Sequence, residues 1–281
     1  MSAPDLHRRI VAFYDETDWM FRTMGLLRGS PAMHAGLWRG VATHRAALHR
    51  LDTTLAERVG VRPGQRILDA GCGAGSSALH LAEVYGVQVI GLTLVPRQAA
   101  RANAAAGNLS NGKAGFLCAD YTRAPLPARS CDVVWAIESI CHGPDKPAFL
   151  AEACRGHNGG HLVVADRFAA ADTPTPAERD ALRSWLTPWA MPDLVSAQQF
   201  ASLAHAEGFT AVSVEDATGA AWPSLRYLGL LAAISLPAAL GLYAGGLQSA
   251  VQIAGIRGCI NQYRTLRQGL WRYALLSARK P

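Results

Sequence analysis

The sequence predicts an α/β protein with a doubly wound, Rossmann-like and mostly parallel sheet. Short apolar strands alternate with helical segments between residues 62 and 170, and the first strand ends in the glycine-rich turn Asp69-Ala70-Gly71-Cys72-Gly73-Ala74-Gly75. Such alternation indicates a parallel sheet, because each helix returns the chain to the edge at which the next strand begins. A chain of 281 residues is long enough for a single catalytic domain with appended helices.

The first 61 residues predict an N-terminal helical cap. Apolar and aromatic residues recur at helical spacing from residue 6 to about residue 61. A Gly-Ser-Pro turn near Pro31 divides this segment.

Residues 62–170 predict the core of the sheet. The expected strands are QRILDA, VQVIGL, AGFLCA, CDVVWAI and HLVVAD, and the helices SSALHLAEVYG and PRQAARANAAAG separate the first three. Pro96 stands at a helix start, and Gly86 and Gly107 stand just past helix ends, where these residue types are favoured.

Residues 171–281 predict helices over an acceptor site and the last strands of the same sheet. One helix is expected around 176–185, and another follows Ser196, which forms a capping box with Gln199 three residues later. The strand FTAVSVED and the final run LWRYALLSA flank hydrophobic helices expected within 224–267.

Charge and cysteine usage exclude several classes of function. The net charge of +6 comes from scattered arginines rather than a basic tract, so we expect no nucleic-acid partner. The six cysteines form no CxxC pair, and no secretory signal is recognised before them. Both observations favour reduced thiols in a cytoplasmic protein.

A metal site is not expected. His142, His157 and His161 lie near Cys141 and Cys154 in the sequence. Their spacing, however, matches no structural zinc pattern and supplies no paired thiolates.

An uncharged stretch covers residues 227–256 and is long enough to cross a bilayer. Pro237, Gln248 and Gln252 interrupt it, and the basic segment that follows reads as part of the sheet. We therefore expect no transmembrane span, but a pair of hydrophobic helices that cover an apolar pocket and make peripheral contact with a membrane. The sequence leaves open whether the protein forms a homodimer.

The glycine-rich turn predicts a nucleotide or nucleoside pocket. It lies where a strand gives way to a helix, so its backbone must turn sharply and approach a ligand closely. A dinucleotide fingerprint would need its third glycine one place later and an acidic ribose ligand about 20 residues on. Here the second strand ends in Gly91-Leu92-Thr93, which disfavours a nicotinamide cofactor.

The pattern Asp-x-Gly-x-Gly-x-Gly resembles the first motif of class I S-adenosylmethionine-dependent methyltransferases. This resemblance implies S-adenosylmethionine as cofactor and S-adenosylhomocysteine as product. It also implies cofactor contacts from Asp69, Gly71, Cys72 and Gly73.

The next two strand ends extend the resemblance to the adenosine half of the cofactor. The segment GLTLVPRQAARAN is similar to tocopherol, sterol-like and sugar O-methyltransferases, in which a hydroxyl residue and a glutamine replace the usual acidic ribose ligand. Thr93 and Gln98 are the matching positions. After the third strand the family uses an aspartate to accept from the adenine amino group, which implies Asp120, with Tyr121 packed against the adenine.

The segment WAIESICHGPDK, residues 135–146, resembles sterol C-methyltransferases and tocopherol methyltransferases. The resemblance places Glu138 and His142 at the junction of cofactor and acceptor, with Glu138 also a cofactor contact. Tyr14 is similar to an N-terminal tyrosine that closes over the cofactor in related enzymes, and His34 in MHAGLW is expected at the same mouth. The chain departs from the family at ACRGHNGG, where an Arg-Val-Leu-x-Pro-Gly-Gly turn is usual.

Two chemistries are open for the acceptor. If a hydroxyl is methylated, His142 would act as base, oriented by Asp166. If an alkene or ring carbon is methylated, Glu138 and aromatic faces would stabilise the resulting cation. The expected acceptor pocket further includes the lid residues Trp185, Trp189, Trp222 and Tyr227.

Uncharged surface beside a methyl-transfer site implies a small lipophilic acceptor. The preferred hypothesis is C-methylation of a prenyl, terpenoid or quinol-like compound in secondary metabolism. The alternatives are O-methylation of a natural product, and a cyclase or binding protein that keeps the scaffold without methyl transfer.

Overall fold

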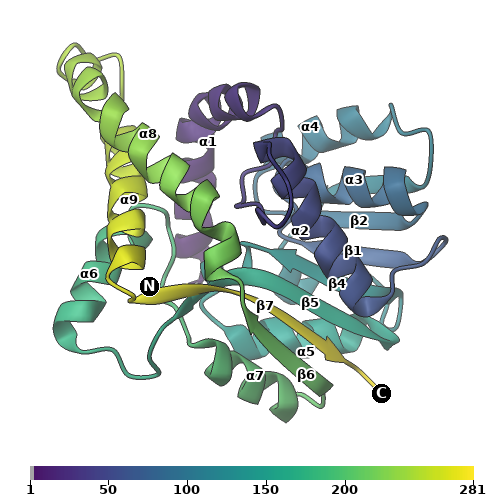
Figure 1. The fold of residues 1–281 in the computed structure, drawn as a ribbon. Coiled ribbons are helices and arrows are strands. Elements are labelled where there is room, and N and C mark those ends of the chain that lie inside the picture. The colour runs from purple at the N-terminus through teal and green to yellow at the C-terminus, as the bar shows by residue number, and fades with distance from the viewer. Residues whose placement is uncertain (1–2) are drawn as a thin grey trace.

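The computed structural model describes residues 3–281 (Figure 1), so Met1 and Ser2 of the expected N-terminal cap lie outside the described residues. A seven-stranded sheet forms its centre and confirms the predicted fold class. The strands across the sheet are β3 (Lys113–Cys118), β2 (Gln88–Thr93), β1 (Arg66–Ala70), β4 (Cys131–Ile137), β5 (His157–Ala169), β7 (Trp271–Arg279) and β6 (Thr210–Asp216).

The sheet reverses its direction of growth between β1 and β4. Strands β1 to β5 are parallel, and β7 runs antiparallel to both β5 and β6. From β1 the chain builds outward through β2 to β3 and then returns to add β4 on the other side. In open α/β sheets a crevice forms at the carboxyl ends of the strands at such a switch point, and ligands bind there.

Alternate residues of the strands face two separate cores. Val133 and Trp135 of β4 pack in one core, beneath α2 (His44–Val59), α3 (Ser76–Tyr85) and α4 (Pro96–Ala106). Val134 packs on the opposite face, beneath α5 (Lys146–Gly156) and α7 (Ala197–Ala206). This two-residue alternation explains why the strands read as almost continuous apolar runs.

Local capping signals largely determine where the helices begin and end. Pro96 opens α4, and Ser196 and Gln199 form the predicted capping box of α7. Gly86 follows α3 in the left-handed conformation with φ of 65°. Gly107 also follows its helix, but its φ of −63° is right-handed, so it ends α4 without the conformation that favours glycine.

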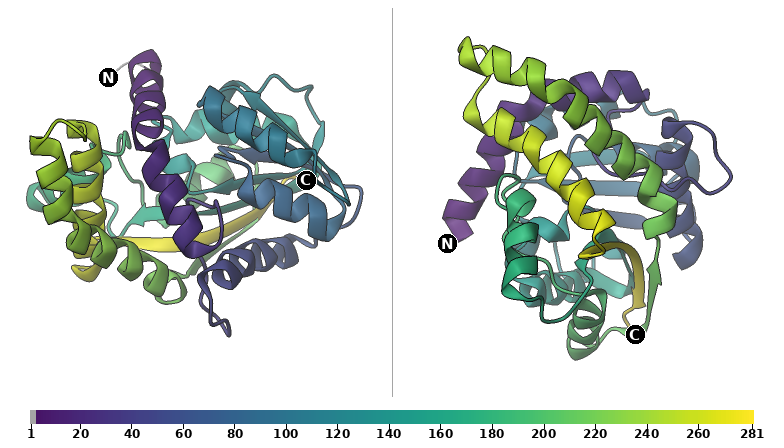
Figure 2. Two further views of the ribbon diagram at one scale, coloured as in Figure 1. Left: turned by 90° about the horizontal axis from the view of Figure 1, so that it is seen from above. Right: turned by 60° about the vertical axis from the view of Figure 1, so that its left-hand side comes forward.

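The C-terminal helices form a hairpin that projects from the body of the molecule (Figure 2). Helix α6 (Pro176–Leu186) lies near its base, α8 covers Thr218–Ala244 and α9 covers Ala250–Arg267. Helix α8 begins before the expected residue 224 and continues through Pro223 and Pro237. Helix α1 (Ala3–Arg28) packs against α9 and runs between the hairpin and the sheet.

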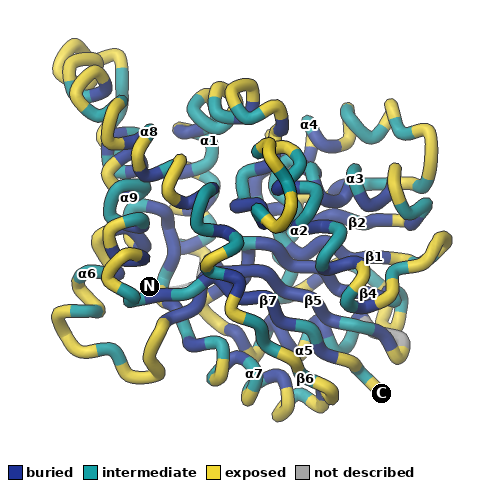
Figure 3. The backbone as a smooth tube through the Cα atoms, viewed as in Figure 1, coloured by how far each residue is buried: buried dark blue, intermediate teal, exposed yellow. Residues whose placement is uncertain are grey.

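Many residues of this hairpin are exposed (Figure 3), and apolar residues are among them. Ile234 and Leu247 are each 77% exposed. Among the described residues one helix, Thr218–Ala244, is long and apolar enough to cross a membrane by length and composition, and 17% of its most apolar window is buried.

Candidate active site

The glycine-rich turn brings the ends of β1 and β4 into close contact. Gly71, Gly73 and Gly75 have φ of 88°, 53° and 83°, in the region that favours glycine. A Cβ on Gly71 would lie 2.3 Å from Cβ of Ser139. Ser139 donates a 2.6 Å hydrogen bond to the carbonyl of Ala70, so the two loops are fixed to each other at this point.

A cavity of about 670 Å³ opens above this turn at the carboxyl ends of β1, β2 and β4. Its volume lies within the range of about 300–1,000 Å³ that is usual for small-molecule sites. Residues at and just after the ends of β1, β2 and β3 form its polar part, here called the polar end, and residues of α1, α8 and the loop after α6 contribute to its apolar part, the apolar end. The polar end includes Asp69, Thr93, Gln98 and Asp120, and the apolar end includes Phe13, Met20, Trp189, Met191 and Leu228.

The polar end fits an adenosine group. Thr93 donates a 2.8 Å hydrogen bond to the side-chain oxygen Oε1 of Gln98. The side-chain nitrogen Nε2 of Gln98 is then oriented as a donor for a ribose hydroxyl. One oxygen of Asp120 accepts from Thr122 at 2.8 Å, and the other lies 3.4 Å from the His7 ring. Because a carboxylate has spare lone pairs, Asp120 can still accept from an adenine amino group.

Asp69 is a buried acid at the glycine-rich turn. Burial, together with the smaller effect of the neighbouring Asp52, raises its pKa to about 8. Among the described residues no cation forms an ion pair with Asp69. An ammonium group of a ligand, such as that of S-adenosylmethionine, would stabilise the ionised form of this carboxyl group and complete its pairing.

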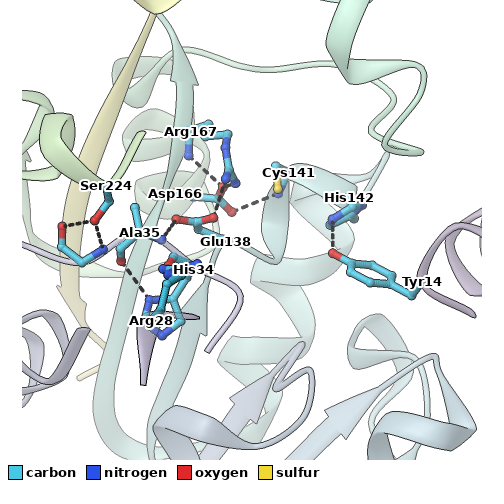
Figure 4. Close-up of polar contacts among 11 residues, drawn as sticks. Tyr14, Arg28, His34, Ala35, Glu138, Cys141, His142, Asp166, Arg167 and Ser224 are labelled. Carbon is cyan, nitrogen blue, oxygen red and sulfur yellow. Dashed lines mark hydrogen bonds and ion pairs between the residues drawn. The ribbon is translucent and has the colours of Figure 1, made fainter. Parts of the chain in front are cut away.

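Glu138 follows β4 in a left-handed conformation, with φ of 47°. Two contacts hold it there (Figure 4): its Oε1 accepts from the Ala35 amide at 2.7 Å, and its Oε2 pairs with Arg167. Both oxygens are therefore engaged by the protein. A non-glycine residue at positive φ persists only where the surroundings fix it, and such residues cluster at functional sites.

The sequence analysis missed Arg167, which lines the same cavity from β5. Burial disfavours its charge, but the nearby Glu138 and Asp166 carboxylates outweigh burial and raise the pKa of Arg167. Its guanidinium lies 5.9 Å from the centroid of the Trp189 ring. The available signal was an arginine directly after Asp166, inside an otherwise apolar strand.

Asp166 is fully buried behind the cavity wall. Its oxygens accept from the amides of Cys141 at 3.0 Å and Arg167 at 2.7 Å. In the described part of the chain, no contact joins it to His142. Asp166 therefore positions the backbone turn that carries His142, rather than orienting the imidazole as expected.

His142 and Tyr14 meet at the cavity wall. His142 Nε2 lies 3.1 Å from the Tyr14 hydroxyl, and its Nδ1 lies 3.5 Å from the Ala190 carbonyl. Because a carbonyl only accepts, Nδ1 carries the proton and Nε2 accepts from Tyr14. Burial, together with the nearby Arg167 and Lys146 charges, lowers the pKa of His142 to about 4, so the imidazole is neutral at pH 7.

The remaining predicted residues separate into two groups. Gly71, Cys72, Gly73, Tyr121, His34 and Trp189 line the cavity. Three others do not line it: Trp185 packs against Trp271 at 5.6 Å, Trp222 against Tyr263 at 5.5 Å, and Tyr227 against His44 at 5.8 Å. Helix α8 instead presents Leu228 to the cavity, because adjacent helical residues point in different directions.

A metal centre has no support among the described residues, where no three His, Cys, Asp or Glu side chains are grouped to hold an ion. The side chain of His157, one of the histidines considered from the sequence, lies outside the described part.

Comparison with known proteins identifies the family. A family model described as a methyltransferase domain matches residues 68–164. The 27-O-demethylrifamycin SV methyltransferase of Amycolatopsis mediterranei is 33% identical over 195 residues, which cover 68% of this chain and 71% of that protein. The 2-methyl-6-phytyl-1,4-hydroquinone methyltransferase of Synechocystis is 35% identical over 178 residues, or 60% of this chain and 55% of that protein.

Among solved structures, the crystal structure of the 4+2 cyclase SpnF is similar with a TM-score of 0.76 and 27% identity, over 97% of this chain and 95% of that chain. The chain belongs to the class I S-adenosylmethionine-dependent methyltransferases. The resemblance predicted from the glycine-rich turn is thereby confirmed, and S-adenosylmethionine is the cofactor.

Proposed function

We propose that this enzyme methylates a small lipophilic acceptor, and that the preferred acceptor atom is a carbon of a prenyl, terpenoid or quinol-like compound. The observation that carries the proposal is the apolar end of the cavity, which continues directly from the polar end that fits the cofactor. The name of the Synechocystis relative, a hydroquinone methyltransferase, supports a quinol acceptor.

When bound, the cofactor supplies an electrophilic methyl group on a sulfonium. The residues of the chain align the acceptor with it and exclude water. Asp69 binds the cofactor ammonium, Gln98 and Asp120 bind the adenosine, and the aromatic faces of Phe13 and Trp189 stabilise positive charge that develops on the acceptor.

His142 receives the proton that the acceptor loses. The cofactor would supply the methyl group and its sulfur would keep the bonding electron pair, so the methylated ring, alkene or hydroxyl would be cationic until it loses a proton. His142 Nε2 is neutral and faces Tyr14 at 3.1 Å. The acceptor therefore displaces the Tyr14 hydroxyl from Nε2 or passes its proton through that hydroxyl.

O-methylation of a natural product is the second candidate, because the relative from Amycolatopsis mediterranei is named for an O-demethylated rifamycin substrate. Both candidates use the same cavity and the same base. They differ only in the acceptor atom that is aligned with the methyl group.

The test is turnover of methyl-labelled S-adenosylmethionine with prenylated hydroquinones, terpenoids and phenolic polyketides. Formation of S-adenosylhomocysteine supports methyl transfer, and the carbon shift of the new methyl in NMR separates carbon from oxygen attachment. A product formed without S-adenosylhomocysteine would instead identify a cyclase on the same scaffold. Binding of S-adenosylhomocysteine without turnover of any acceptor would contradict the proposal.

We further propose that the far end of the α8–α9 hairpin makes peripheral contact with a membrane. The contact would let lipophilic acceptors enter the cavity without crossing water. The uncharged residues 227–256 and the exposed Ile234 and Leu247 support this proposal.

A further inference from the structure

Arg28 is a half-buried cation in the cavity wall, and the described residues supply no counter-ion for it. It ends α1 and donates hydrogen bonds to the His34 carbonyl at 2.8 Å and to the His44 ring at 2.5 Å. The carbonyl carries no charge. The His44 ring is also neutral at pH 7, because burial lowers its pKa to about 4. Among the described residues no carboxylate forms an ion pair with Arg28.

A cation in a cavity wall that has only neutral acceptors can bind an anionic group of a ligand. Burial lowers the pKa of Arg28 to about 10, so the guanidinium stays charged at pH 7. Glu138, the carboxylate that acts on it most strongly, already has both oxygens bonded to Ala35 and Arg167. Because Arg28 lines the cavity and its own acceptors are neutral, a ligand that enters the cavity is expected to supply an anion for it.

The position of Arg28 indicates which part of the ligand carries this anion. The ring of His34 lies 3.3 Å from the Ser77 hydroxyl, in the first turn of α3. The neighbouring Met33 lies over the glycine-rich turn, where a Cβ on Gly73 would be 2.7 Å from its methyl group. The segment that accepts from Arg28 thus lies against the glycine-rich turn and the start of α3.

Helix α3 adds to the anion preference of this end. Its N-cap is Gly75, which has no side chain to accept from the first amides, and Ser76 and Ser77 line the cavity. Free amides and the helix dipole favour a negative group at a helix N-terminus.

We propose that Arg28 binds the carboxylate at the amino-acid end of the cofactor, while Asp69 binds the ammonium group of the same end. This inference rests on the cofactor assignment but not on the acceptor. It makes Arg28, from the N-terminal helix rather than the sheet, the residue that selects a cofactor with an intact amino-acid group. The carboxylate of an acidic acceptor would be the other source of such an anion.

The test compares two ligands by isothermal titration calorimetry: S-adenosylhomocysteine, and 5′-deoxy-5′-methylthioadenosine, which lacks the amino-acid group. Arg28→Met should weaken the binding of S-adenosylhomocysteine about 10- to 100-fold, the usual range for a hydrogen bond between charged groups. It should leave the affinity for methylthioadenosine within about twofold, because that ligand has no carboxylate for Arg28 to bind. Arg28→Lys should restore part of the affinity.

Arg58→Met is the matched control, because Arg58 is half-buried on α2 and pairs with Glu215 away from the cavity. It should not distinguish the two ligands. An equal loss for both ligands in Arg28→Met would show a structural role and overturn the proposal. Unchanged affinity for S-adenosylhomocysteine would also overturn it, and a raised KM for acidic acceptors alone would then assign Arg28 to the acceptor. If the affinities change as expected but no acceptor is methylated, the proposed function is contradicted while the role of Arg28 in cofactor binding stands.

Discussion

At the residue scale, the site depends on backbone conformations that few side chains adopt. Gly71 combines a positive φ with direct contact to Ser139, and Glu138 keeps a positive φ despite its side chain. Both lie at the junction of cofactor and acceptor. Local strain here is stabilised by contacts from distant segments, such as the amide of Ala35 on Glu138.

Gly71→Ala should destabilise the protein by about 2–4 kcal/mol, because the new methyl adds a clash with Ser139 to the cost of positive φ. Gly64→Ala is the control, since Gly64 has φ of 81° but nothing within 4 Å of a new Cβ. That variant should lose only about 1–2 kcal/mol of unfolding free energy. Chemical denaturation measures both, and equal losses would show that Ser139 does not confine this turn.

His142→Ala should lower kcat about 10²- to 10⁴-fold, the usual contribution of a positioned base, while the Kd of S-adenosylhomocysteine stays within a few-fold. Because the pKa of His142 is lowered to about 4, kcat of the wild type should stay level above about pH 5 and fall as pH drops through 4. A decline that begins near pH 6.5 would mean that the imidazole is not buried as described.

The sequence identified residues whose role depends on local pattern, and it missed those that depend on distant contacts. The residues of the glycine-rich turn, Gln98 and His142 follow strand ends, so their convergence could be inferred from a parallel sheet. Arg28 and Arg167 approach the same cavity from the end of α1 and from the interior of β5. Neither position carries a motif, so only the packed structure brings them together.

At the element scale, helix ends were predictable because capping uses neighbouring residues, whereas helix orientation was not. Trp185, Trp222 and Tyr227 were expected in the acceptor pocket from their aromatic character. Each instead packs against another ring outside the cavity wall. Which face of α6 or α8 meets the cavity depends on α9 and α1, which are distant in the sequence.

The α8–α9 hairpin should be responsible for membrane binding. Ile234→Glu and Leu247→Glu place charges on its exposed apolar end and should reduce co-sedimentation with phospholipid vesicles several-fold. Val84→Glu is the control, because Val84 is 55% exposed on α3, away from the hairpin. Turnover of detergent-dispersed acceptor should be unchanged in all three. A change from dimer to monomer without any vesicle binding would show that a second copy covers this end.

At the scale of the whole molecule, the cavity lies between the carboxyl ends of the strands and helices from both terminal parts of the chain. The ends of β1, β2 and β3 supply the polar end, whereas α1, α8 and α9 supply much of the apolar end. Cofactor and acceptor recognition can therefore respond differently to pH. The buried acid Asp69 makes cofactor binding the pH-sensitive part above neutrality.

Without cofactor, the raised pKa of Asp69 makes the folded state bind more protons than the unfolded state between about pH 4 and 8. Its contribution to stability is thus complete at low pH and is lost as pH rises through 8. The cofactor ammonium stabilises the ionised carboxylate, so binding at pH 7 should release close to one proton. Affinity for S-adenosylhomocysteine should then rise about tenfold per pH unit up to pH 8.

Calorimetric titrations at pH 7 in buffers of different ionisation enthalpy measure this proton release directly. Asp69→Asn cannot release a proton, so its apparent binding enthalpy should be independent of the buffer and its affinity should be nearly level between pH 6 and 8. Asp52→Asn keeps the carboxyl group of Asp69 but removes the neighbouring acid that raises its pKa. In that variant the rise in affinity should shift to lower pH. Proton release that persists in Asp69→Asn would mean that another group, rather than Asp69, faces the cofactor ammonium.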